Sequence, residues 1–284
     1  MARTISCPSC GAFAMAQYCG QCGEKRVGHH DLSVRHYLDE WLETAIHLDS
    51  KVVRSIGELV RRPGGLSVSH FLGRRVRYVT PLRLFLFLSI VYFFSSSIYP
   101  NPAFTTPLAI QLHGNDFYPG FAAEQVARTL HHKGWDYATL EQHYDAKTAV
   151  LSKTMVFSLI PVFALLFAAL LFRKRRHFPE HMVVATHFWS FALLLIGVFI
   201  PLLMAAFTAV GSRLGVPDSV LSSDAVPTIY LQCSFAIYLY LMLRRVYAVS
   251  YWYGALVAAG IAWSFFFIVW LFRFLLFIVT LSLL

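Results

Sequence analysis

Long apolar stretches alternate with polar segments along this chain. The apolar stretches cover approximately residues 82–99, 149–172, 182–210, 226–243 and 251–284. About 20 consecutive apolar residues are enough for a helix that crosses a membrane. The pattern therefore predicts an all-α polytopic membrane protein with about five transmembrane helices. The last stretch is longer than one span needs, which leaves open one bent span, a span with an apolar tail, or two spans.

The polar segments predict the order of the domains. Residues 1–27 contain four cysteines, and residues 28–81 combine an amphipathic helical stalk with a basic segment that leads into the first span. Residues 82–284 then form the transmembrane domain. Within that domain, residues 100–150 are polar and mixed in charge. We expect them to be the main extracytoplasmic segment, with one or two amphipathic helices.

Composition and charge support this assignment and orient the chain. The sequence has 284 residues, of which 57% are apolar and 14% charged, whereas a soluble domain has about 25% charged residues. The net charge is +9, and basic residues gather beside apolar stretches, as at Arg173–Arg176 and Arg244–Arg245. Cytoplasmic loops are enriched in Lys and Arg. We therefore expect a cytoplasmic N-terminus and an extracytoplasmic C-terminus, and nucleic acid is the disfavoured partner.

The clearest chemical motif is a pair of Cys-x-x-Cys turns formed by Cys7, Cys10, Cys19 and Cys22. Four thiolates at this spacing are typical of a tetrahedral zinc site. No apolar signal segment precedes them, so we expect them in the reducing cytoplasm, where metal binding is favoured over disulfides. The motif predicts a small structural zinc ribbon, with iron in the same geometry and thiol exchange left open. Cys233 is expected to be a small core residue.

A basic patch precedes the first span. It consists of Arg74, Arg75, Arg77 and Arg83, with Tyr78 among them. Arginines beside an aromatic residue at a membrane surface are suited to anionic lipid headgroups or phosphate. The first interpretation is that the patch is a topology signal, and binding of a lipid headgroup or phosphate is the sharper alternative.

Residues 7–98 resemble a known family. The cysteine motif is followed by Asp49-x-Lys51, by Pro63-Gly64, and by the segment Gly73-Arg74-Arg75-Val76-Arg77-Tyr78-Val79-Thr80-Pro81. This order is similar to the bacterial inner-membrane family catalogued as domain of unknown function 3667, which has a short zinc ribbon and a Gly-Lys-Arg-x-x-Tyr-x-x-Pro motif. Arg74 stands where that family has lysine. The resemblance implies a multi-pass protein of the bacterial inner membrane with a cytoplasmic ribbon, and it carries no established activity.

Polar residues within the apolar stretches are candidates to line a cavity. We single out His187, Gln232, Ser234, Tyr238 and Tyr240, because polar groups inside a span often serve function. His177, His181 and His187 gather at the inner end of the third span, where interfacial histidines are favoured over a metal site. No Asp or Glu lies inside an expected span, and no catalytic Ser-His-Asp order or phosphate-binding glycine loop occurs.

These patterns favour a non-enzymatic integral membrane protein with a docking, regulatory or lipid-binding role. The expected cofactor is structural zinc, since four protein ligands leave no open coordination position. The expected partners are membrane lipids with anionic headgroups and a protein bound through the ribbon. A transporter or channel for a small solute, ion or lipid is the first alternative. A lipid-modifying enzyme that uses Arg74, Arg75 and the histidines is the second.

Overall fold

The computed structural model describes residues 5–6, 13–14, 50–73, 77–99, 103–113, 118–221, 223 and 225–284. The chain divides into two units, Met1–Val53 and Arg54–Leu284. In the first unit, strands β1 (Ile5–Ser6) and β2 (Phe13–Ala14) pair antiparallel, with Ile5 opposite Ala14. All four N-terminal cysteines lie outside the described residues, and so do residues 28–49. The zinc ribbon therefore stays a prediction.

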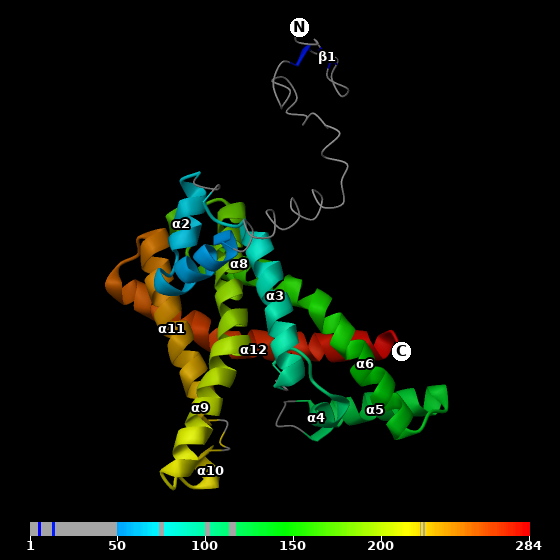
Figure 1. Ribbon diagram of the computed structural model, residues 1–284. Helices are drawn as coiled ribbons and strands as arrows, with labels where there is room; N and C mark the ends of the chain where they lie inside the picture. Colours follow the sequence, from blue (N-terminus) through cyan, green and yellow to red (C-terminus); the bar gives the residue numbers. More distant parts are fainter. Residues whose placement is uncertain are drawn as a thin grey trace. The chain divides into compact units, whose positions relative to one another are not determined.

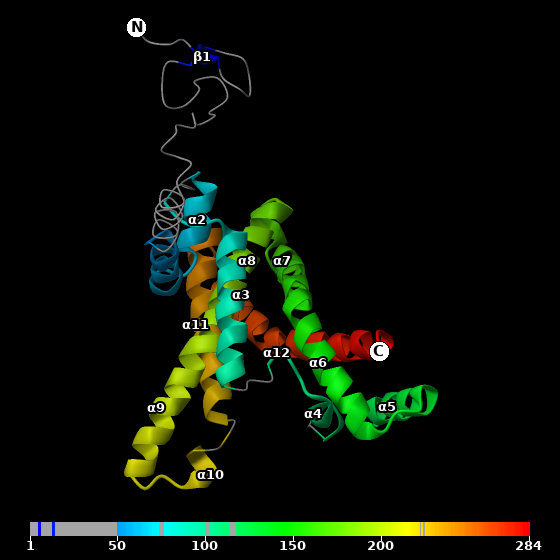
Figure 2. The same ribbon diagram turned by 45° about the vertical axis from the view of Figure 1, so that its right-hand side comes forward.

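The second unit is built from helices, which Figures 1 and 2 show in two views. Residues 50–61 are helical. The elements that follow, in chain order, are α2 (Gly65–Phe71), α3 (Pro81–Ile98), α4 (Leu108–His113), α5 (Pro119–Lys133), α6 (Tyr137–Met155), η2 (Val156–Ser158), α7 (Leu159–Leu170), η3 (Phe172–Lys174), α8 (Phe178–Leu194), η4 (Leu195–Phe199), α9 (Ile200–Arg213), α10 (Asp218–Leu221), α11 (Ala225–Tyr247) and α12 (Tyr251–Ser282).

Five helical runs among the described residues are long and apolar enough to cross a membrane. They are Pro81–Ile98, Tyr137–Leu170, Phe178–Arg213, the run that contains α11 (Ala225–Tyr247), and Tyr251–Ser282. The prediction of a helical, multi-pass membrane protein with about five spans is confirmed at this level.

The second and third of these runs extend beyond the apolar stretches that predicted them. The second begins at Tyr137 and continues through the short 3₁₀ turn η2 into α7, because no helix breaker separates its polar first half from its apolar second half. The third joins α8 to α9 through the π-helical turn η4, which ends at Phe199, two residues before Pro201. Proline lacks a backbone N–H, and a local change of helix type accommodates that loss within a continuous run.

The core of the helical unit is aromatic. Trp189 of α8 is fully buried and lies edge-to-face against Phe163 of α7, with ring centroids 5.0 Å apart. Phe265 of α12 packs against Phe235 of α11 with centroids 4.6 Å apart. Such pairs add about 0.5–1.5 kcal/mol to the burial of their area. These contacts join helices from four parts of the chain. Cys233, which we expected in this core, is exposed on α11, so that expectation was wrong.

Helix α12 is one uninterrupted helix, so the last apolar stretch does not divide into two helices. At its start, Lys174 Nζ donates to the carbonyl of Ala248 at 3.0 Å, which ties the turn before α12 to the arginine-rich end of α7. At its end, Lys133 Nζ donates to the carbonyl of Leu284 at 2.7 Å, and Lys147 Nζ donates to that of Leu283. The helix therefore runs from the arginine-rich end of the unit to the polar segment formed by α4, α5 and the first half of α6.

Candidate functional site

The turn before α2 is seated on the end of α11. Gly64 has φ of +79°, a left-handed conformation that glycine adopts without strain. A Cβ added at Gly64 would lie 2.9 Å from Val246 Cγ2 and 3.2 Å from the carbonyl oxygen of Met242. Arg245 Nη1 donates to the carbonyl of Pro63 at 2.7 Å. The Pro63-Gly64 sequence thus allows a close backbone approach to α11, and Arg245 holds the turn there.

Helix α2 is fixed to α8 by a buried polar pair. Ser67 Oγ lies 2.8 Å from His187 Nδ1, and both residues are buried. Next to His187 is a cavity of about 20 Å³, also lined by His70, Tyr78 and Thr80. A polar cavity of that size suits one water molecule. His187 is therefore a buried partner of α2.

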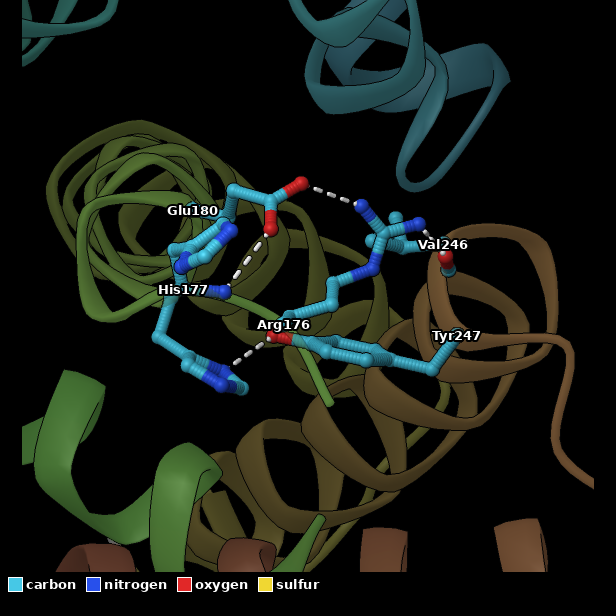
Figure 3. A network of polar contacts seen from close by, with 6 residues as sticks. Arg176, His177, Glu180, Val246 and Tyr247 are labelled. Carbon is cyan, nitrogen blue, oxygen red and sulfur yellow. Dashed lines mark hydrogen bonds and ion pairs between the residues drawn. The ribbon is translucent and has the colours of Figure 1, made fainter. Parts of the chain in front are cut away.

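An arginine at the start of α8 connects the same elements (Figure 3). Arg176 Nη1 donates to Glu180 Oε1 at 2.6 Å, and Nη2 donates to the carbonyl of Val246 at 2.8 Å. Its guanidinium lies 4.9 Å from the ring centroid of Phe71 in α2 and 5.6 Å from that of Tyr247 in α11. A planar guanidinium can bond at its edge and stack on its face at the same time. Arg176 therefore contacts α2, α8 and α11 together.

Glu180 and His181 complete this arrangement. Glu180 Oε2 accepts a hydrogen bond of 2.9 Å from the backbone N–H of His177, which satisfies one of the free donors at the start of α8. His181 Nδ1 lies 2.8 Å from the hydroxyl of Tyr247, and the two rings stack with centroids 5.5 Å apart. We call the contacts of Pro63, Ser67, Arg176, His181 and Arg245 the polar junction of α2, α8 and α11.

The polar junction pairs its histidines with separate partners. His181 bonds to Tyr247 of α11, and His187 bonds to Ser67 of α2. Among the described residues, no group of three His, Cys, Asp or Glu side chains could hold a metal ion. In this part of the chain the arrangement ties three helices together with buried and half-buried hydrogen bonds.

Three residues of the predicted basic patch, Arg77, Tyr78 and Arg83, are among the described residues. Arg74 and Arg75 lie outside the described residues. Arg77 and Arg83 are exposed, and Tyr78 is half-buried at the small cavity beside His187. The Arg77 guanidinium is 5.7 Å from the Tyr78 ring centroid. The structure thus presents two of the predicted arginines to the surroundings.

The predicted cavity residues do not come together at one place. His187 lies in the polar junction, whereas the other four lie on α11. Tyr238 is buried and stacks on Phe191 at 3.7 Å. Gln232, Ser234 and Tyr240 are half-buried, and Tyr240 lies 5.8 Å from the Arg244 guanidinium.

Sequence reasoning missed Ser67, Arg176 and Tyr247 as members of the site. For Arg176 a signal was present, because Glu180 follows it at the i,i+4 spacing and stands in the first turn of α8. Ser67 and Tyr247 carry no such local signal. Their partners His187 and His181 are 120 and 66 residues away.

These helices define the class of the molecule, which is a multi-pass integral membrane protein. Residues 49–93 match the model of the family described as "Protein of unknown function (DUF3667)", which confirms the predicted family resemblance over that segment. The matched residues include the Pro63-Gly64 turn, α2 and most of α3, and they exclude the four cysteines. No curated protein and no solved structure matches the chain.

Proposed function

We propose that this chain is a non-enzymatic docking protein of the bacterial inner membrane. In this proposal residues 49–93 join a cytoplasmic zinc ribbon to the membrane helices and transmit its state to them. One observation carries the proposal: the family-matched segment is locked to α8 and α11 through the polar junction, by the Ser67–His187 pair and the Arg245 bond to Pro63. A segment that only linked two parts of the chain would not need buried polar contacts with two spans.

The cysteines that precede the matched segment and the arginines within it have different tasks in this proposal. Cys7, Cys10, Cys19 and Cys22 bind structural zinc and shape a surface for a protein partner. Arg77 and Arg83 are exposed before and at the start of α3, where they contact anionic lipid headgroups together with Arg74 and Arg75. The partner acts on the ribbon, the lipids hold the basic patch, and the polar junction connects both to the helices.

Hydrogen exchange on the full-length protein in lipid nanodiscs tests the connection. We expect removal of zinc by a chelator to raise amide exchange in α2 and in the first turns of α8. The Gly64→Ala variant should raise exchange in α2 by about tenfold with zinc still bound, because an alanine at positive φ costs about 1–2 kcal/mol. Its matched control is Gly57→Ala. No heavy atom of the described residues lies within 4 Å of a Cβ at Gly57, so exchange there should not rise.

Helix α5 (Pro119–Lys133) belongs to the other end of the unit and serves as the internal reference. Its exchange should not respond to zinc. If α2 and α8 also fail to respond to zinc while metal analysis shows complete loss, the ribbon is not connected to the helices and the proposal is wrong.

Metal content tests the ribbon separately. Purified full-length protein should contain one equivalent of zinc, and replacement of Cys7 and Cys10 by serine should abolish it, because two thiolates are too few for a closed tetrahedral site. Iron in place of zinc, or less than about half an equivalent of metal, would contradict the zinc assignment.

A further inference from the structure

The largest cavity that we describe lies away from the polar junction, between α9, α11 and α12. Its volume is about 690 Å³, within the range of about 300–1,000 Å³ that small-molecule sites occupy. The π-helical turn η4 closes one side, and α9 and α11 form two walls. Figures 1 and 2 show that α9 and α11 are neighbours connected through α10, with α12 crossing near them. The cavity is therefore a groove between helices of the membrane domain.

The lining of this groove is apolar with one charged residue. The apolar part includes Ile200, Met204, Leu231, Phe265 and Val269. The charge comes from Arg273 of α12, which is half-buried. Its Nε donates to the hydroxyl of Thr106 at 2.7 Å, which fixes the direction of the guanidinium. The groove thus combines a long apolar wall with a held positive charge.

Arg273 lies towards the end of the last apolar span, where a long basic side chain can reach the polar boundary of the membrane. A guanidinium suits phosphate oxygens in particular, since its planar donors match two oxygens at once. The apolar walls suit hydrocarbon chains, which the surrounding membrane supplies. The Arg273 end of the groove includes Tyr99 and Ala103 and so adjoins the segment that follows α3, where a headgroup would lie near the membrane surface.

We propose that this groove binds one anionic phospholipid, with its phosphate at Arg273 and an acyl chain between α9 and α11. The site is distinct from the basic patch at Arg77 and Arg83, which lies with the polar junction at the other end of the helical unit. Lipid at Arg273 would hold α9 and α11 in their present positions. Because no residue of the polar junction lines the groove, we expect lipid binding there to be unaffected by zinc removal.

Native mass spectrometry of the delipidated full-length protein tests the site, with phosphatidylglycerol and phosphatidylcholine as the probes. We expect one phosphatidylglycerol molecule to bind tightly to each protein, and phosphatidylcholine to bind more weakly. Arg273→Gln should lower the affinity for phosphatidylglycerol about tenfold, as expected for a lost charge-assisted hydrogen bond. Arg273→Lys should lower this affinity less. Arg213→Gln is the matched control, because Arg213 is exposed at the end of α9 and does not line the groove.

A second pair of variants keeps the test valid if Arg273→Gln does not fold. Ala205 lines the groove, so Ala205→Trp should fill it and block the lipid, whereas the neighbouring Ala206 is exposed and does not line it. Ala206→Trp should bind like the wild type. The proposal is overturned if Ala205→Trp and Arg273→Gln bind phosphatidylglycerol normally. It is also overturned if both lipids bind equally, or if inorganic phosphate displaces the lipid, since the occupant would then be any acyl chain or a solute.

Discussion

At the scale of single residues, buried polar pairs explain how a short helix is held on a membrane domain. Ser67 and His187 satisfy each other where neither contacts bulk solvent. Ser67→Ala should lower the free energy of unfolding by about 1–3 kcal/mol, since it leaves a buried ring nitrogen without its partner. Thermal unfolding in detergent measures this. Ser69→Ala on the same helix is the control, because Ser69 is only half-buried. Equal melting temperatures for both variants would show that the pair contributes nothing.

Individual residues also differ in how far their part in the site could be predicted from the sequence. His187 was identifiable as a polar residue inside an apolar stretch, and Arg77 and Arg83 as part of a basic patch. Their roles were less visible, because His187 bonds to a serine 120 residues earlier. Side-chain pairs between helices that are distant in the chain leave no periodic signal in sequence. The contacts of Arg176 with Phe71 and Tyr247 are of the same kind.

At the scale of elements, the long apolar stretches predicted the number of spans but not where each span ends. The run from Tyr137 to Leu170 includes polar residues that the pattern assigned to a separate segment. A helix in water and a helix in lipid have the same backbone, so a change from polar to apolar side chains need not end the helix. The π-helical turn η4 was not predicted either. Only Pro201 hinted at an irregularity there, and proline alone does not specify its form.

The turn η4 also brings α3 close, which yields a prediction for the element. A Cβ added at Gly197 would lie 3.0 Å from both Cα and Cδ2 of Tyr92. Gly197→Ala should therefore destabilise the protein by about 1–3 kcal/mol through overpacking. Gly260→Ala on α12 is the matched control, since no heavy atom of the described residues lies within 4 Å of that Cβ. Gly260→Ala should be neutral or stabilising by about 0.5–1 kcal/mol. A stable Gly197→Ala would contradict the close approach of the two helices.

At the scale of the whole helical unit, polar contacts mark two ends. Pro63 bonds to Arg245 at one end, and Leu284 bonds to Lys133 at the other. Helix α12 joins these ends without interruption. Its 32 residues span about 48 Å at 1.5 Å per residue, more than the hydrocarbon thickness of about 30 Å. A helix of this length can tilt or extend beyond the hydrocarbon, and Figures 1 and 2 show it running across α3 and α8.

This arrangement predicts that the two ends of α12 lie on opposite sides of the membrane. Ser250 and Ser282 are both exposed, so Ser250→Cys and Ser282→Cys, each combined with Cys233→Ala, report on the two ends. With intact cells and a membrane-impermeant maleimide, Ser282→Cys should be labelled, and Ser250→Cys only after permeabilisation, because the positive-inside rule predicts a cytoplasmic location for the arginine-rich end. Labelling of both from one side would mean that α12 turns back within the membrane. Reversed labelling would retain the single crossing and contradict the cytoplasmic placement of the polar junction and, with it, of the predicted zinc ribbon.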